Sequence, residues 1–452
     1  MLLNLRRISL AAAGFALLLL SPGALNAHAK LVRSDPENGA KLDSAPQRIT
    51  LTFSERPEIA LSSFRLVGPV GDTIVLSPLQ HEQNDEYSLS ARVPLGIVPG
   101  NYRLLWRAAG SDGHPSHGTI SFFVNPLRKA QQAVRAAPPE MPVDHDETAN
   151  VAVAGAIGSI LSRWLSFVAC FLLIGVVTFR FVVLKRMSPT GNDLFTHIAS
   201  TNAATLGIAA SVAGLFAAML KLMRESSDMP DASIASMMFD STWGWSLVLQ
   251  IIGVVIAGIA LVVVHRPGES QKRYWNAALA GAILVALSPS LSAHAGASKL
   301  ALIAIPTDML HVVVGGAWLG TLTVIVIVGI SAALKTPDAL RPGARVAEMI
   351  NVFSPLALTC GAAIVLTGIG SAFIELPSVT SLWTTPYGVV LLLKLLFVAL
   401  LLAAGAWNWQ RMKPRLTGDN EIGPMRSSAS LELTLALAVL AVTAILVALE
   451  LP

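Results

Sequence analysis

Charged residues and cysteines are both scarce in this chain of 452 residues. Only 13% of the residues are charged and 53% are hydrophobic, which excludes a protein that is soluble throughout. The two cysteines, Cys170 and Cys360, both lie in apolar runs, so neither a disulfide framework nor a CxxC zinc site is available. No GxxxxGKS/T or DKTG-like sequence occurs, which argues against an ATP-driven pump. The net charge of +4 fits membrane topology better than nucleic-acid binding, so no nucleic-acid partner is expected.

Residues 1–27 have the pattern of a secretory signal peptide. A positive n-region and an apolar core are followed by a run of small residues that ends at Ala27. The apolar core is shorter than the ~20 residues that span a bilayer, which makes an uncleaved anchor the weaker alternative. Cleavage after Ala27 would leave His28 as the first residue of the mature protein, and cleavage after Ala24 is the other option.

Residues 28–125 alternate apolar and polar side chains in short runs between turn-forming residues. Ile49, Leu51 and Phe53 share one face of such a run. This period of two predicts strands that pack one face on a core. Seven strands are expected, the number of an immunoglobulin-like β-sandwich: residues 30–33, 47–53, 61–68, 72–76, 86–93, 101–108 and 118–124.

Three residues of this segment have the chemistry of a copper(II) site. Cleavage would give His28 a free α-amine beside its imidazole, and copper(II) prefers such nitrogen ligands. Asp112 and His114 are two positions apart, so in an extended stretch their side chains point the same way. Together the three residues offer an amine, two imidazoles and a carboxylate, which predicts a copper(II) site.

The same segment resembles the CopC family of periplasmic copper proteins. The resemblance rests on HAKLVRSDPENGAKLDSAPQRITLTFSE at 28–55, PGNYRLLWRAAGSDGHP at 99–115 and GTISFFV at 118–124. It implies copper(II) binding by His28, Asp112 and His114, whereas His117 is not part of the family motif. Some members hold copper(I) in a methionine-rich loop, but residues 28–140 contain no methionine, so no such site is expected here.

A linker and a membrane domain follow. Residues 126–150 are rich in proline and charge and predict a tether. Residues 151–452 predict an all-α membrane domain, with eight apolar runs of spanning length at about 151–178, 202–223, 243–264, 276–294, 307–333, 350–373, 386–408 and 429–449. We expect Pro306 to separate a short interfacial piece from the fifth helix, because residues 300–334 would otherwise form one helix about 50 Å long.

Basic residues predict the orientation of this domain. The loops after odd-numbered helices hold thirteen Lys and Arg residues, whereas the even-numbered loops hold only Arg224 and Lys299. By the positive-inside rule the odd loops are cytoplasmic. The sandwich and the C-terminus are therefore expected on the outer side, with the helices in the lipid bilayer.

Soft and ionisable residues gather near the outer side of the predicted helices. Thioether and imidazole suit copper(I), and an ionisable residue inside a span is a functional candidate because its burial is costly. The candidates for a copper path are Met219, Met223, His294, Asp308, Met309, His311 and Lys394. Arg163 also falls inside a span, and Cys170 with Cys360 would bind copper(I) only as a facing pair.

This half resembles the CopD family of copper-resistance membrane proteins. The similar segments are SLSAHAG at 290–296, DMLHVVVGGAWLGTL at 308–322, FSPLALTCGAAIVLTGIGSA at 353–372 and TPYGVVLLLKLLFVALLLAAGAWN at 385–408. The resemblance makes His294, Asp308, His311 and Lys394 the leading positions. The whole chain is thus interpreted as a CopC–CopD fusion in a bacterial inner membrane that captures copper(II) in the periplasm and passes it to the membrane domain. Copper import, homeostasis and resistance are the expected roles, and periplasmic copper chaperones are candidate partners.

Three other interpretations stay open. The helices would act as a haem-containing copper reductase if paired axial histidines faced one another in the bundle. A histidine brace also activates oxygen in copper oxygenases, but Asp112 as a further ligand argues against an open reactive position. Sequestration of copper without transport is the third. We expect no enzymatic activity.

Overall fold

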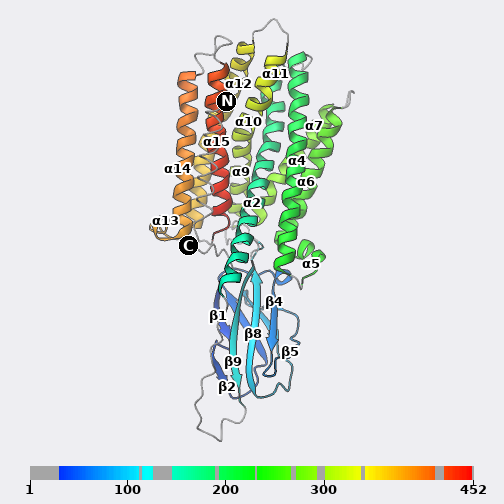
Figure 1. The fold of residues 1–452 in the computed structure, drawn as a ribbon, viewed down its shortest axis with the longest axis vertical. Helices are drawn as coiled ribbons and strands as arrows, with labels where there is room; N and C mark the ends of the chain where they lie inside the picture. Colours follow the sequence, from blue (N-terminus) through cyan, green and yellow to red (C-terminus); the bar gives the residue numbers. More distant parts are fainter. Residues whose placement is uncertain are drawn as a thin grey trace.

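A computed structural model describes residues 30–110, 113, 115–125, 145–188, 193–229, 232–265, 271–292, 301–336, 342–412 and 422–449. Figure 1 shows a β-sandwich at one end of a bundle of long helices. The all-β and all-α halves expected from the sequence are both present.

The sandwich consists of two sheets. One contains β1 (Leu31–Asp35), β3 (Arg48–Phe53), β7 (Asp85–Arg92) and β6 (Gln80–Glu82), in that order. The other has the order β2 (Ala40–Leu42), β9 (Pro115–Val124), β8 (Gly100–Ala109), β4 (Ser63–Val67) and β5 (Thr73–Ile74). The described residues thus hold the seven expected strands and two more, β2 and β6. Both are three residues long, too short to show an alternating pattern.

The predicted strand faces form the core of the sandwich. Ile49, Leu51 and Phe53 are buried, as are the alternate residues of β8 and β9. The rings of Phe53 and Trp106 meet edge to face with their centroids 5.5 Å apart. A period of two therefore predicted both the strands and the side of each that is buried.

Eight helical segments in the described residues are long and apolar enough to cross a membrane, which confirms the predicted number. They are built from α2 (His145–Thr178) with η2 (Phe179–Leu184) and α3 (Lys185–Met187); α4 (Leu194–Asp228); α6 (Thr242–Val264); α7 (Gln271–Ser292); α9 (Ala301–Gly315) with η3 (Gly316–Gly320), α10 (Thr321–Val324), η4 (Ile325–Gly329) and α11 (Ile330–Lys335); α12 (Pro342–Glu375); α14 (Pro386–Trp407) with η5 (Asn408–Met412); and α15 (Ile422–Leu446). The short helices α5 (Ile234–Phe239) and α13 (Ser381–Thr384) lie at the end of the bundle that faces the sandwich (Figure 1).

Two helix boundaries differ from the expectation. Pro306 does not break the fifth span, because α9 runs through it from Ala301. Proline inside a helix removes the backbone N–H that would pair with the Leu302 carbonyl, a loss that membrane helices tolerate. The Thr307 hydroxyl also donates to the Ile303 carbonyl at 2.8 Å. Helix α2 begins at His145, inside the predicted linker; residues 126–144 lie outside the described part of the chain.

A side-chain cap explains where α6 starts, and a glycine contact explains how closely α2 packs on η3. The Ser241 hydroxyl accepts a hydrogen bond from Gly244 N at 2.9 Å and begins α6. A Cβ added to Gly175 of α2 would lie 2.1 Å from the carbonyl carbon of Gly320. Two backbones therefore touch in the centre of the bundle, a contact that only glycine permits.

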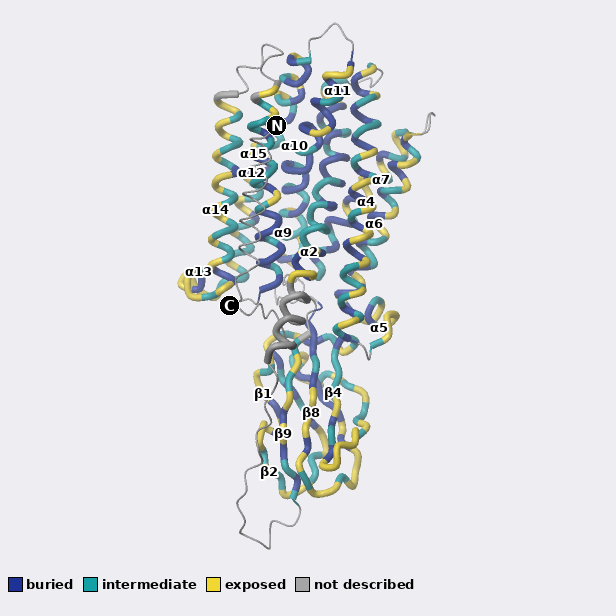
Figure 2. Tube along the Cα trace, in the orientation of Figure 1, coloured by how far each residue is buried: buried dark blue, intermediate teal, exposed yellow. Residues whose placement is uncertain are grey.

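The helices differ in which residues they expose. Lys335 is exposed on α11, at the end far from the sandwich in Figure 1. Buried positions are concentrated in the middle of the bundle, whereas α14 exposes residues along most of its length (Figure 2). A helix of this composition with exposed apolar residues is suited to contact with lipid.

Candidate functional site

The predicted copper loop is the turn between β8 and β9. Ala109 and Pro115 are the last paired residues of the two strands, and Gly113 N donates to the Gly110 carbonyl at 3.0 Å. Gly113 has a φ of +77°, which favours glycine at this position. Asp112 and His114 flank Gly113 and lie outside the described residues.

Lys30, the first described residue, lies at the same end of the sandwich. Lys30 N donates to the Ser54 hydroxyl at 2.9 Å, and Ser54 N donates to the Lys30 carbonyl at 2.8 Å. The next residue, Glu55, packs its carboxylate against Gly110: a Cβ on Gly110 would lie 2.6 Å from Oε1. His28 is outside the described residues, but two residues of extended chain reach about 7 Å from Lys30. The neighbours of all three predicted ligands therefore converge.

This end of the sandwich is docked on the membrane domain. Leu61 and Ala109 share one buried apolar cluster with residues of α4, α5 and α6 and the segment between α4 and α5: Ala218, Met229, Met237, Trp243 and Leu247. Thr242 N, at the start of α6, donates to the Glu58 carboxylate at 3.3 Å. Gly113 touches the Trp243 ring, since a Cβ added there would lie 2.4 Å from Cδ1. The turn that holds the predicted copper ligands thus rests on α6.

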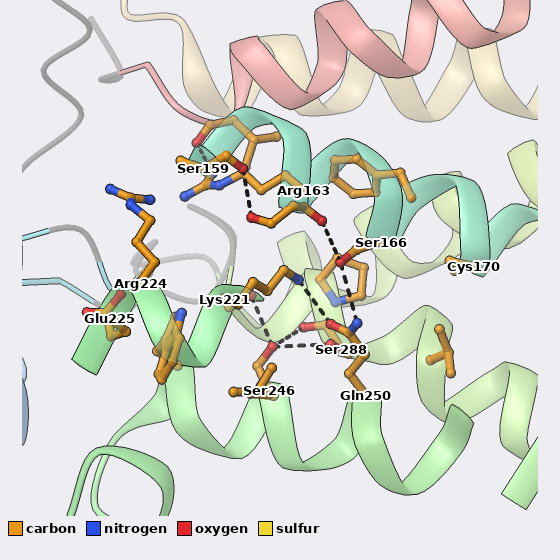
Figure 3. A pocket seen from close by; sticks show the side chains of 18 residues that line it. Ser159, Arg163, Ser166, Cys170, Lys221, Arg224, Glu225, Ser246, Gln250 and Ser288 are labelled. Carbon is orange, nitrogen blue, oxygen red and sulfur yellow. Dashed lines mark hydrogen bonds between the residues drawn. The ribbon is translucent and has the colours of Figure 1, made fainter. Parts of the chain in front are cut away.

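A polar cavity of about 80 Å³ lies next to this contact, and Trp243 forms part of its wall. It is lined by the ends of α2, α4, α6 and α7 that face the sandwich and by Val447, which follows α15. Figure 3 shows Arg163, Lys221, Gln250 and several serines around it. The sequence analysis singled out Arg163 but missed the others, because Lys221 and the serines are spread over four helices.

Hydrogen bonds connect the walls of the cavity. Lys221 Nζ donates to Gln250 Oε1 at 2.9 Å, and Gln250 Nε2 donates to the Ser166 hydroxyl at 3.4 Å. Arg163 donates to the Val447 carbonyl at 2.7 Å, and the Ser246 hydroxyl donates to the Ser288 carbonyl at 2.8 Å. The cationic side chains of Arg163, Lys221 and Arg224 in one cavity repel a copper ion electrostatically, so this lining is a poor copper site.

Three of the predicted membrane residues, Asp308, His311 and Lys394, meet elsewhere, between α9, α12 and α14. His311 Nδ1 lies 2.8 Å from the Thr367 hydroxyl, and the Lys394 charge acts on the His311 ring. Lys394 is itself attracted by Asp308 and Glu375, and the Tyr387 hydroxyl donates to Glu375. We call Asp308, His311, Thr367, Glu375, Tyr387 and Lys394 the α9–α12–α14 cluster. Glu375 and Tyr387, at the end of α12 and the start of α14, were not predicted from the sequence.

The predicted methionines are not gathered in one place. Met219 and Met223 expose 57% and 56% of their surface on α4, while Met309 is partly buried on α9. Met229 and Met237 are instead buried beneath the sandwich. His294 lies outside the described residues, and those that are described contain no group of three His, Cys, Asp or Glu residues placed to hold a metal. Cys170 and Cys360 are both free and buried.

Three family matches cover most of the chain. Residues 31–125 match the CopC domain, residues 154–303 match the copper resistance protein D-like N-terminal domain, and residues 347–446 match copper resistance protein D. The matches follow the chain in the order sandwich, first helices, last helices.

Individual proteins are also similar to this chain. Copper transport protein CutJ of Bacillus subtilis (strain 168) is 24% identical over 401 residues, which are 87% of this chain and 70% of CutJ. Protein YobA of Escherichia coli (strain K12) is 34% identical over 98 residues, 22% of this chain and 79% of YobA. CopC from Methylosinus trichosporium OB3b, whose crystal structure is known, has 26% sequence identity to this chain. The structural match has a TM-score of 0.21 and covers 22% of this chain and 96% of the CopC chain.

Proposed function

Because the chain belongs to the copper resistance family as a CopC–CopD fusion, we propose that it captures copper(II) outside the cell and passes copper inward through its helices. The observation that carries the proposal is the docking of the sandwich. The end of the sandwich where the described neighbours of the predicted ligands converge is the end that rests on the membrane domain.

Capture of copper(II) is the first step. His28 supplies its α-amine and imidazole, Asp112 a carboxylate and His114 a second imidazole, a ligand set that suits copper(II). The carboxylate also offsets part of the charge of the ion. Support for this site comes from the convergence of Lys30, Ser54 and Gly110 at one end of the sandwich.

Transfer to the membrane domain is the second step. Gly113 contacts Trp243 at the outer end of α6, so copper released from the loop leaves at the surface of the helices rather than into bulk solution. Leu61 is fully buried in the same contact, which makes docking a favourable state. A docked donor raises the local copper concentration without a further binding partner.

The receiving site of the proposal is on the outer half of α9. His311 and Asp308 offer an imidazole and a carboxylate, and Met309 a thioether; His294 is the fourth candidate. Glu375 adds a negative charge that attracts Lys394. The exposure of Met219 and Met223 favours lipid contact over copper binding.

Import follows from the proposed orientation. With the sandwich outside, the membrane potential pulls copper cations inward with about 2.3 kcal/mol per charge per 100 mV. The chain would therefore move copper down an electrochemical gradient, with no nucleotide hydrolysis and no enzymatic step.

Copper accumulation in cells tests the receiving site. We expect the double substitution His294→Ala and His311→Ala to abolish accumulation while the sandwich still binds copper(II). His265→Ala, at the far end of α6, is the matched control and should accumulate copper normally. Normal accumulation in the double variant would remove both histidines from the path.

A further inference from the structure

A second cleft, of about 420 Å³, lies at the junction of the sandwich and the membrane domain. The sandwich side of its wall comes from η1 (Ile59–Leu61), β4 and β8, and the other side comes from α5 and the residues just before it. Figure 1 shows α5 at the end of the bundle that faces β4. Among the described residues of the wall, Arg107 is the one charged side chain, so the cleft carries a positive charge.

The guanidinium group of Arg107 has no protein partner in the part of the chain that the structure describes. Arg107 is half-buried on the outer face of β8, between Ser63 of β4 and His117 of β9. It forms neither a hydrogen bond nor an ion pair with a described residue. A guanidinium carries five N–H donors in a planar fork that matches the oxygens of a phosphate or a carboxylate. A half-buried arginine of this kind favours a bound anion.

Three serine hydroxyls of the wall are also available as donors. Ser63, Ser233 and Ser236 donate to no described residue, although the Ser233 oxygen accepts a hydrogen bond from Ser236 N at 3.0 Å. Ser62 is different, because its hydroxyl already donates to a backbone carbonyl at 2.7 Å. The available donors come from both domains: Arg107 and Ser63 from the sandwich, Ser233 and Ser236 from the membrane domain. An anion held by both sets would connect the two domains.

The cleft lies near the membrane surface. Helix α6 has 23 residues, and at 1.5 Å per residue its length of about 35 Å is close to the ~30 Å core of a bilayer. Its first turn, and α5 just before it, therefore lie near the headgroups. Ile234 and Phe239 of α5 are 52% and 54% exposed, and the Trp245 ring meets Phe239 edge to face with the centroids 5.9 Å apart. Exposed apolar and aromatic side chains at this depth are typical of contact with lipid.

We propose that the cleft binds the phosphate group of a phospholipid from the leaflet on the sandwich side, with Arg107 as the main donor. The glycerol and acyl chains then lie against Ile234 and Phe239. Arg65 and Arg103 are exposed on the same outer face of the sheet as Arg107, and their positive charge favours an anionic headgroup such as phosphatidylglycerol. A free phosphate compound has the same oxygens but no chains for α5, so it should bind more weakly.

Lipid binding to the purified full-length protein in dodecyl maltoside tests the proposal. Native mass spectrometry would measure the affinity for dioleoyl phosphatidylglycerol, for dioleoylglycerol, which has the same chains without phosphate, and for glycerol 3-phosphate, which has no chains. The first molecule of phosphatidylglycerol should bind more tightly than either of the others. Arg107→Gln should weaken its binding about tenfold, the effect of one charge-assisted hydrogen bond.

Matched variants locate the site. Arg103→Gln, four residues further from the membrane domain on the same face of β8, should bind phosphatidylglycerol like the unmodified protein. Arg107→Lys keeps the charge and should retain part of the affinity, which keeps the test valid if Arg107→Gln fails to fold. Unchanged affinity in a folded Arg107→Gln, or equal binding of dioleoylglycerol, would overturn the proposal. Equal binding of glycerol 3-phosphate would also overturn it, since the ligand would then be a free phosphate compound.

Discussion

Docking of the sandwich depends on Leu61. This side chain is fully buried, and its buried neighbours are Ala109 and residues of the membrane domain, not the core of the sandwich. The substitution Leu61→Ala removes apolar contacts and should weaken the free energy of docking by about 2 kcal/mol. This value is at the low end for a buried leucine, because the two domains can readjust. The ratio of docked to undocked molecules should therefore fall about 30-fold. Leu61→Asp should separate the domains further, since it places a carboxylate in an apolar contact.

Spin labels on full-length protein measure this ratio. Cysteines introduced at Val75 of the sandwich and Phe239 of α5 are exposed sites for labelling, and the native Cys170 and Cys360 are buried. Double electron–electron resonance would show one narrow distance population when the domains are docked and a broad one when they are not. Leu95→Ala is the matched control, because Leu95 is 96% exposed. If Leu61→Asp gave the same distances as Leu95→Ala, the docking contact would not hold the sandwich.

Three further predictions concern the copper loop and the topology. One residue inserted before His28 should weaken copper(II) binding by orders of magnitude, because the α-amine leaves its chelating position; an unchanged EPR spectrum and affinity would refute this. Copper(II) binding should quench the fluorescence of Trp243, which contacts Gly113, so Trp243→Phe should reduce the quenching while Trp383→Phe leaves it unchanged. A reporter active only in the cytoplasm should be silent when fused after Pro452, and activity would mean that the number or orientation of spans is wrong.

Much of the fold could be predicted because burial imposes a period on the sequence. Alternation around Ile49 and Tyr102 predicted the strands, and the length of the apolar runs predicted eight spans. The short strands β2 and β6 could not be found, since three residues carry no period. Pro306 was misinterpreted because a proline inside a membrane helix removes one backbone hydrogen bond without ending the helix.

The sites were harder to predict than the fold. Lys221, Gln250 and Ser288 come from three helices, and only packing brings them to one cavity. Glu375 and Tyr387 stand twelve positions apart at the ends of two helices, and their hydrogen bond depends on the turn between them. Leu61 and Met237 belong to one buried cluster that joins the sandwich to the short helix α5, and no local sequence pattern indicates such a cluster between domains.

Copper accumulation tests the central claim most directly. Three kinds of cell are compared: cells that produce the full-length protein, cells that lack it, and cells that produce the variant with one residue inserted before His28. External copper is the same for all, and the two producing strains have equal protein levels. The account predicts more cellular copper with the unmodified protein and no gain with the variant. Lower cellular copper on production, or equal gain with the variant, would contradict import through a docked copper(II) donor.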